Sequence, residues 1–168
     1  MTDAAASSVH ASAVLVGERA VLIRGPSGSG KSRLAFDLVL AGRAGQIAAA
    51  MLVGDDRVYL EAAKDQLIVR PARELEGLLE IRGLGIRRCE FAEQAPVSLV
   101  VDLSAADAER LPATEALACE IYGIKLPRIP VAAGFQPLPL VLAALSTRPS
   151  DDCPKGFGNH ISPTIATQ

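Results

Sequence analysis

Aromatic residues are scarce in this sequence. Phe, Trp and Tyr together make up 4% of its 168 residues, and tryptophan is absent. The formal net charge is only -2, so the chain lacks the basic excess that marks a general nucleic-acid-binding protein, and we expect no nucleic acid partner. Aliphatic residues, in contrast, are abundant. Hydrophobic residues make up 49% and charged residues 21%, as in a globular domain with a core of Val, Leu, Ile and Ala.

Cysteine is also rare. The three cysteines, Cys89, Cys119 and Cys153, are far apart, and none stands in a C-x-x-C pair. This spacing predicts reduced thiols rather than a disulfide framework or a zinc site. Residues 1–8 show no basic segment followed by an apolar one, and no apolar run approaches the length of a membrane span. We therefore expect a cytoplasmic protein with no membrane partner.

The motif that organises the chain lies at residues 25–32. It fits the phosphate-loop pattern G-x-x-x-x-G-K-[ST] at every fixed position, reading Gly25, Pro26, Ser27, Gly28, Ser29, Gly30, Lys31 and Ser32. The apolar run at residues 20–23 predicts a strand before the loop. Residues 32–40 have helical spacing after it, and Gly42 is a candidate cap for that helix.

The residue types in this motif suit phosphate binding. Glycines let consecutive backbone N–H groups point inward at an anion, and the following helix directs its positive end to the same place. Lys31 can reach the β- and γ-phosphates, and the Ser32 hydroxyl can ligate Mg²⁺. A Gly- and Ser-rich turn before an ordinary helix is the alternative. The order of the segments along the chain, with a strand, the loop, the Lys-Ser pair and then a helix, favours a nucleoside triphosphate site.

The order of the other segments predicts an α/β fold with a mixed sheet. After one good helix the middle of the chain is mostly strands, whereas a doubly wound fold would alternate strands with helices. Expected strands and hairpins cover residues 9–23, 48–53, 57–70, 78–91, 97–103 and 121–131, and further helices are expected at 105–118 and 138–145. We expect a single domain over residues 1–145 and a mobile tail over 146–168.

Acidic residues follow two of the apolar strands. Asp55 and Asp56 come directly after Gly54, where adjacent carboxylates could divide the tasks of holding Mg²⁺ and accepting a proton. Alone, the pair could be a solvated turn, but the phosphate loop upstream favours a functional role. Asp102 follows four apolar residues in the manner of a Walker-B strand and competes with the pair for the metal.

Two further features stand beside these acids. Residues 79–86 form a second Gly-spaced segment, in which Glu80 offers a metal ligand and Arg82 an anion clamp, although glycines between strands often only mark turns. His10 lies on the strand expected before the phosphate loop. A lone histidine is more often structural than functional.

Together these segments resemble the catalytic domain of HPr kinase/phosphorylase, a bacterial family that phosphorylates a serine of the phosphocarrier protein HPr. The resemblance runs from His10 to about Leu142. It is carried by Val9-His10 and by residues 25–32, 53–58, 79–86 and 123–131. Residues 80–86 are the most specific of these segments. It implies a mixed-sheet P-loop domain related to phosphoenolpyruvate carboxykinase, in agreement with the strand-rich middle. Family members commonly carry a further N-terminal domain, so we expect a short form without it.

The resemblance also implies the chemistry. ATP and Mg²⁺ would be the cofactors and HPr the protein partner, and a homo-oligomer would agree with it. The catalytic residues that it implies are His10, Lys31, Asp56 and Arg110, with Asp56 taking the proton from the target serine. The implied metal ligands are Ser32 and Glu80, and Asp55 is a third candidate.

One segment departs from the family pattern. Where family members usually show an arginine-bearing P-V-R-P-G-R-N, residues 130–136 carry no charge. Arginines there would offset the repulsion between inorganic phosphate and phosphoserine in the reverse reaction. We therefore predict a serine kinase with weak or absent phosphorylase activity. The alternatives are a small-metabolite kinase, which needs a lid helix with arginines, and a non-catalytic nucleotide-binding module.

Overall fold

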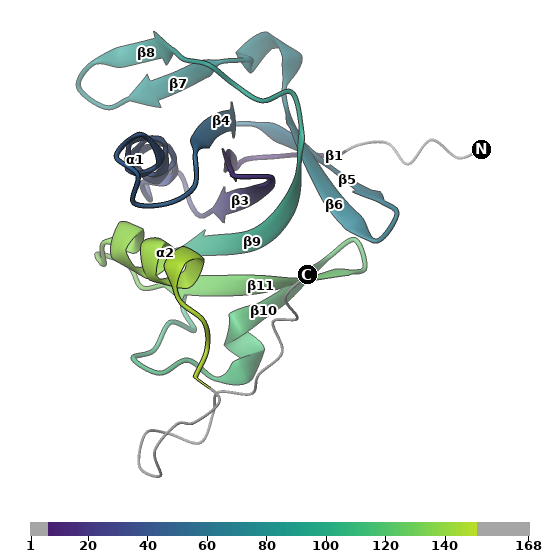
Figure 1. The fold of residues 1–168 in the computed structure, drawn as a ribbon, viewed down its shortest axis with the longest axis vertical. Coiled ribbons are helices and arrows are strands. Elements are labelled where there is room, and N and C mark those ends of the chain that lie inside the picture. Colours follow the sequence, from purple (N-terminus) through teal and green to yellow (C-terminus); the bar gives the residue numbers. More distant parts are fainter. Residues whose placement is uncertain (1–6, 151–168) are drawn as a thin grey trace.

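A curled nine-stranded sheet forms the framework of residues 7–150, the part of the chain that the computed structural model describes. In Figure 1, α1 lies between the β7–β8 hairpin and α2, all on one side of the sheet. In chain order the elements are β1 (Ser7–Val9), β2 (Ser12–Val16), β3 (Arg19–Arg24), α1 (Lys31–Arg43), β4 (Ala50–Gly54), β5 (Val58–Ala63), β6 (Gln66–Pro71), the 3₁₀ turn η1 (Arg73–Leu75), β7 (Leu78–Ile81), β8 (Gly85–Arg88), β9 (Ala95–Leu103), the 3₁₀ turn η2 (Thr114–Leu117), β10 (Ala118–Ile121), β11 (Ile124–Val131) and α2 (Pro137–Ser146).

The sheet is mixed, as the sequence predicts. Its main path runs β1-β5-β6-β9-β3-β2-β4, with β11 paired to β9 and β10 to β11. β3 and β11 run parallel to β9, whereas the hairpin-linked strands pair antiparallel. Because β3 and β9 lie side by side in the same direction, their carboxyl ends place Arg24 directly beside Asp102.

The two faces of the sheet carry separate apolar cores. Side chains alternate between faces along a strand, so Val21 and Ile23 pack with α1 whereas Leu22 packs in the second cluster. On β9, Val101 belongs to the first cluster and Val100 to the second in the same way. Both central strands are therefore covered on both faces, which explains their continuous apolar runs.

Helix α1 extends past the glycine that we expected to cap it. Gly42 lies inside the helix, and the C-cap is Ala44. A Cβ on Gly42 would lie 2.6 Å from the backbone nitrogen of Ala50. Glycine at this position therefore permits the close approach of α1 to β4, and its role as a cap was wrongly predicted.

The expected helix over residues 105–118 is also wrong. The structure has turns there, then η2, and β10 begins at Ala118. Arg128 explains the difference, because its guanidinium donates to both carboxylate oxygens of Asp107, at 2.7 and 3.0 Å, and to the carbonyl of Ala116 at 2.8 Å. Pro112 has no N–H to offer a helix in the same stretch. A distant side chain therefore fixes Asp107 and takes one backbone carbonyl, that of Ala116, which a helix could have used.

The strand expected from residue 9 is split, because β1 ends at Val9 and pairs with β5 whereas β2 begins at Ser12, so His10 lies between two strands. The other expected elements are present with small shifts of boundary. The hairpins β2–β3, β5–β6 and β7–β8 and the final helix α2 all occur where the sequence predicts them. Cys89 and Cys119 are free thiols. Cys153 and residues 151–168 of the expected tail lie outside the described part of the chain. No helix within residues 7–150 is long and apolar enough to cross a membrane.

Candidate active site

The loop between β3 and α1 has the backbone that a phosphate cradle requires. Gly28 and Gly30 have φ values of 78° and 98°, in the left-handed region that favours glycine. A Cβ on Gly25 would lie 2.6 Å from the Ser29 hydroxyl and 3.0 Å from the Cβ of Leu103. A side chain at position 25 would therefore push the loop away from the end of β9.

Lys31 is folded back over this loop. Its ammonium group donates to the carbonyls of Gly25 and Pro26, at 2.9 and 3.0 Å, and the residue is only 6% exposed. Burial lowers the pKa of Lys31, and the negative charges of Asp55 and Asp56 partly oppose that effect. An anion in the loop would supply a stronger partner than two neutral carbonyls, so the side chain is well placed to bind phosphate.

Ser29 provides a direct test of whether the loop suits a phosphate. Its hydroxyl is buried and has no hydrogen-bond partner within the part of the chain that the structure describes. A buried polar atom without a partner is unfavourable unless a ligand or water completes it. Together with the inward-turned glycines, this hydroxyl fits a loop built to hold phosphate oxygens.

Asp55 lies beneath the start of α1 and contacts the last residue of the motif. The Ser32 hydroxyl donates to Oδ1 and Oδ2 of Asp55, at 2.8 and 2.9 Å. The Ser12 hydroxyl donates to Oδ1 at 2.6 Å, and the backbone amide of Glu80 lies 3.3 Å from Oδ2. The Asp55 residue is 3% exposed, so this carboxylate is held from three directions inside the protein.

Asp56, the next residue, faces the opposite way. Its φ is 65°, and the amide of Arg57 donates to the carbonyl of Asp55 at 2.7 Å, which closes a tight turn around it. The Asp56 side chain is 70% exposed, and its Oδ1 lies 3.0 Å from Nε2 of His10. A non-glycine residue in left-handed backbone often marks a functional position, because the surrounding structure must enforce it.

A pocket of about 690 Å³ brings most of the predicted residues together. Its lining includes His10, Lys31, Ser32, Asp56 and Glu80 beside the glycines of the loop. Asp55 is not part of the lining but lies behind Ser32. A larger and more open hollow, of about 960 Å³ near Arg43 at the other end of α1, contains none of the predicted site residues.

The oxygen donors at this pocket are of the kind that Mg²⁺ takes in proteins. Residues 7–150 contain no group of three or more His, Cys, Asp or Glu side chains that could hold a metal. Ser32, Asp55 and Glu80 instead combine one hydroxyl with two carboxylates. Mg²⁺ usually takes one or two carboxylates together with the phosphates of a nucleotide, so these residues suit it.

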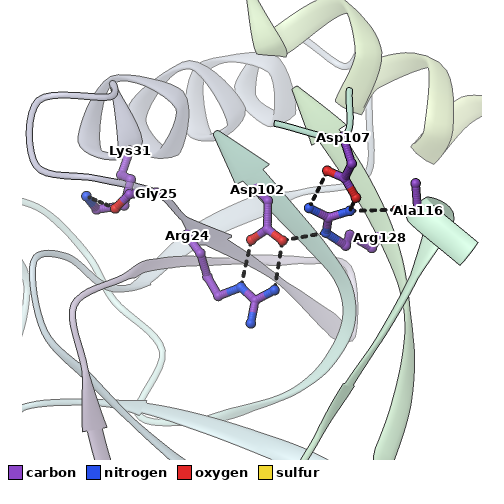
Figure 2. A network of polar contacts seen from close by, with 7 residues as sticks. All are labelled: Arg24, Gly25, Lys31, Asp102, Asp107, Ala116 and Arg128. Atoms are coloured by element: carbon purple, nitrogen blue, oxygen red, sulfur yellow. Dashed lines mark hydrogen bonds and ion pairs between the residues drawn. The ribbon is translucent and has the colours of Figure 1, made fainter. Parts of the chain in front are cut away.

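Asp102, the rival candidate for the metal, is paired with arginines instead. Figure 2 shows its carboxylate between two guanidinium groups, with Arg24 donating at 2.7 and 2.8 Å and Arg128 at 2.5 Å. Burial acts to raise the pKa of Asp102, but these hydrogen bonds outweigh it and hold the pKa below its usual value. Hydrogen bonding to Asp107 is the largest cause of a raised pKa at Arg128. It is Asp55, not Asp102, that contacts Ser32.

Of the four predicted catalytic residues, Arg110 is the one that does not line the pocket. It lies in the turns between β9 and η2, is exposed, and is not among the residues that line the pocket. Residues 130–136, where the family pattern would place arginines, cover the end of β11 and the turn before α2, and Phe135 is 71% exposed.

Comparisons with known proteins show the family of this chain. The family model described as the HPr Serine kinase C-terminal domain matches residues 2–148. The chain belongs to that family. A curated relative, an HPr kinase/phosphorylase from Mycoplasma mycoides subsp. mycoides SC, is 29% identical over 151 residues, covering 82% of this chain and 46% of the relative. The chain thus spans less than half the length of that relative.

A solved structure of the HPr(Ser) kinase/phosphatase from Coxiella burnetii is also similar. It superposes with a TM-score of 0.65 at 28% sequence identity, covering 83% of this chain and 93% of that one. The HPr kinase fold expected from the sequence is therefore confirmed. One contact in the site was missed by sequence reasoning, the one between Ser12 and Asp55, because a serine within an apolar strand gives no signal of its partner 43 residues away.

Proposed function

We propose that this chain is an ATP- and Mg²⁺-dependent protein-serine kinase that phosphorylates HPr. The observation that carries the proposal is the position of Asp56, an exposed carboxylate beside His10 in the same pocket as Lys31 and Ser32. Membership of the HPr serine kinase family supports the choice of substrate. The free thiols of Cys89 and Cys119 agree with a reducing cytoplasm, and we place the protein there.

The residues of the pocket divide the work of phosphoryl transfer. The loop amides and Lys31 would hold the β- and γ-phosphates, while Ser32, Glu80 and Asp55 would hold Mg²⁺, which neutralises phosphate charge when bound. Asp56 is exposed and can meet a serine hydroxyl carried by another protein. His10, 3.0 Å away, fixes the orientation of the Asp56 carboxylate.

The reaction then follows from these positions. The serine oxygen bonds to the γ-phosphorus as the bond from that phosphorus to the β–γ bridging oxygen breaks, and ADP leaves. The hydroxyl proton passes to Asp56. Because phosphoryl transfer needs little covalent help from the protein, the pocket contributes mainly positioning and charge stabilisation.

The charges near the pocket support the proposal that phosphorolysis is weak. The Lys and Arg residues that line the pocket are Lys31, Arg33 and Arg82, and Arg33 is paired with Asp37 at 3.2 Å. Arg128 cannot substitute for the missing family arginines while it is held by Asp102 and Asp107. We therefore propose that the forward kinase reaction dominates.

The small-metabolite kinase is the weaker alternative. It requires a lid helix that carries arginines, and the segment expected to form one, residues 105–118, contains no α-helix and has Arg110 as its one arginine. A non-catalytic module would bind nucleotide without turnover.

One experiment separates these functions. The purified protein is incubated with ATP, Mg²⁺ and HPr, and any phosphate on HPr is located by mass spectrometry. Phosphoserine on HPr is the expected result. Nucleotide binding without phosphate on HPr would favour the non-catalytic module, and ATP turnover that depends on a small metabolite would favour the other kinase.

A further inference from the structure

Three polar or charged residues are buried among those that the structure describes: Ser12, Lys31 and Asp55. Lys31 and Asp55 have places in the proposed site. Ser12 lies on β2, is 0% exposed and is not part of the pocket lining. It cannot touch a nucleotide or a protein substrate, so any role in the reaction must act through a neighbour.

That neighbour is Asp55. The Ser12 hydroxyl donates to Oδ1 of Asp55 at 2.6 Å, a short bond of the charge-assisted kind. β2 and β4 pair antiparallel with Ala13 opposite Gly54, and the register shifts between Ala13 and Val14. Such irregularities redirect side chains, and here one brings the hydroxyl of β2 to the acid that follows β4.

The Asp55 carboxylate has two kinds of donor. The Ser32 hydroxyl, which lines the pocket, would turn its oxygen toward Mg²⁺ when the ion binds, and its hold on Asp55 would then weaken. Ser12 donates to Asp55 from inside the protein at 2.6 Å, and the backbone amide of Glu80, at 3.3 Å, is a donor that a cation does not attract. They are the contacts that can keep the carboxylate oriented in the metal-bound protein.

We propose that Ser12 is a positioning residue for the metal site. Its hydroxyl fixes Oδ1 of Asp55, so that the carboxylate stays directed at Ser32 and the ion beside it. Partners of this kind behind a metal ligand typically change metal affinity about 10–100-fold when they are removed. The inference rests on the proposed function only in taking Mg²⁺ as the ion held at Ser32, Asp55 and Glu80.

A purely structural role for Ser12 predicts something different. If its hydroxyl only satisfied a buried carboxylate, its loss would lower stability without a specific effect on metal affinity. The test must therefore measure metal binding separately from folding and from nucleotide binding. Val14, on the same strand and 0% exposed but in the apolar core, provides a matched control for loss of buried packing.

The experiment compares Ser12→Ala, Ser12→Thr and Val14→Ala with the wild type. Mn²⁺ serves as the probe ion, and its binding in the presence of a non-hydrolysable ATP analogue is followed by electron paramagnetic resonance. Ser12→Ala should bind Mn²⁺ about tenfold more weakly, with nucleotide affinity in EDTA unchanged. Ser12→Thr, which keeps the hydroxyl, should restore the affinity. Val14→Ala should lower the unfolding midpoint and leave Mn²⁺ affinity unchanged.

Several outcomes would overturn the inference. Wild-type Mn²⁺ affinity in a folded Ser12→Ala protein would do so, as would an equal loss of affinity in Val14→Ala. If Ser12→Ala does not fold, Ser12→Cys takes its place, since a thiol is a weaker donor of similar shape. It should show an intermediate affinity, and full affinity would reject the role. Failure of the wild type to bind Mn²⁺ with nucleotide would instead reject the proposed function itself.

Discussion

Asp55 and Asp56 are neighbours in the chain but lie in opposite environments. The first is 3% exposed and accepts hydrogen bonds from Ser12 and Ser32, whereas the side chain of the second is 70% exposed and lies beside His10. The tight turn at Asp56, with φ of 65°, separates their directions. This geometry supports a division of roles, with Asp55 toward the metal and Asp56 toward the substrate hydroxyl.

Asp56→Asn should retain nucleotide affinity and lose phosphotransfer. An amide can hydrogen-bond the serine hydroxyl but cannot accept its proton, and removal of a general base lowers a rate by about 10²–10⁴-fold. Single-turnover transfer from ATP to HPr measures the loss. Asp65→Asn is the control, because Asp65 is also an exposed aspartate with positive φ, of 64°, but lies in the β5–β6 turn. A normal transfer rate for Asp56→Asn would exclude the assigned role.

Lys31→Ala should abolish productive nucleotide binding while the fold stays intact. Within residues 7–150, the hydrogen bonds of the ammonium group go to the loop carbonyls of Gly25 and Pro26, at 2.9 and 3.0 Å, so their loss removes no contact with the apolar core. Calorimetric titration with ATP and Mg²⁺ tests binding, and circular dichroism tests the fold. Lys125→Ala, an exposed lysine on β11, should behave as the wild type. Normal ATP turnover by Lys31→Ala would contradict the prediction.

Asp102→Asn should affect stability rather than Mg²⁺ dependence. The change leaves the partly buried guanidinium groups of Arg24 and Arg128 without their shared carboxylate. Because the pair is only partly buried, the free energy of unfolding should fall by roughly 1–3 kcal/mol. Urea denaturation measures this loss. Asp55→Asn should show the reverse pattern, with a clear loss of Mg²⁺ dependence. Equal effects on catalysis at both positions would favour Asp102 as the metal ligand.

Asp102→Asn should also change the dependence of stability on pH. Because the folded pKa of Asp102 lies below its usual value, the carboxylate stabilises the fold at pH values above the unfolded pKa of about 3.9. This stabilisation should disappear as the pH falls through the folded pKa. As the pH is lowered into the acid range, the free energy of unfolding measured by urea denaturation should therefore fall less in Asp102→Asn than in the wild type.

Phosphorolysis should be weak or absent. Two multiply charged anions must approach each other in that reaction, and residues 130–136 provide no cation to offset their repulsion. The test supplies phosphoserine-HPr with excess inorganic phosphate and assays pyrophosphate, with the forward rate of the same preparation as the reference. Pyrophosphate release at a rate comparable to the forward reaction would reject the prediction.

The local sequence was sufficient to predict those parts of the structure that depend on contacts between neighbours in the chain. The glycines and Lys31-Ser32 of the phosphate loop, the strand before it and the hairpins β5–β6 and β7–β8 depend on contacts within a few residues, so their patterns are readable. The mixed sheet followed from the same local patterns, because they left too few helices for strict alternation.

Tertiary structure alone decided the features that depend on distant residues. Arg128 binds Asp107, 21 residues earlier, and the expected helix over 105–118 is replaced by turns. Asp55 rather than Asp102 contacts Ser32 because the strand order places β4 and β9 on opposite sides of the β3–β2 pair, and the partners of Asp102 come from β3 and β11. The Ser12 contact likewise depends on how β2 and β4 pair. Periodicity along a chain reports which face a side chain takes, but the partner it meets there is set by the packing of the whole sheet.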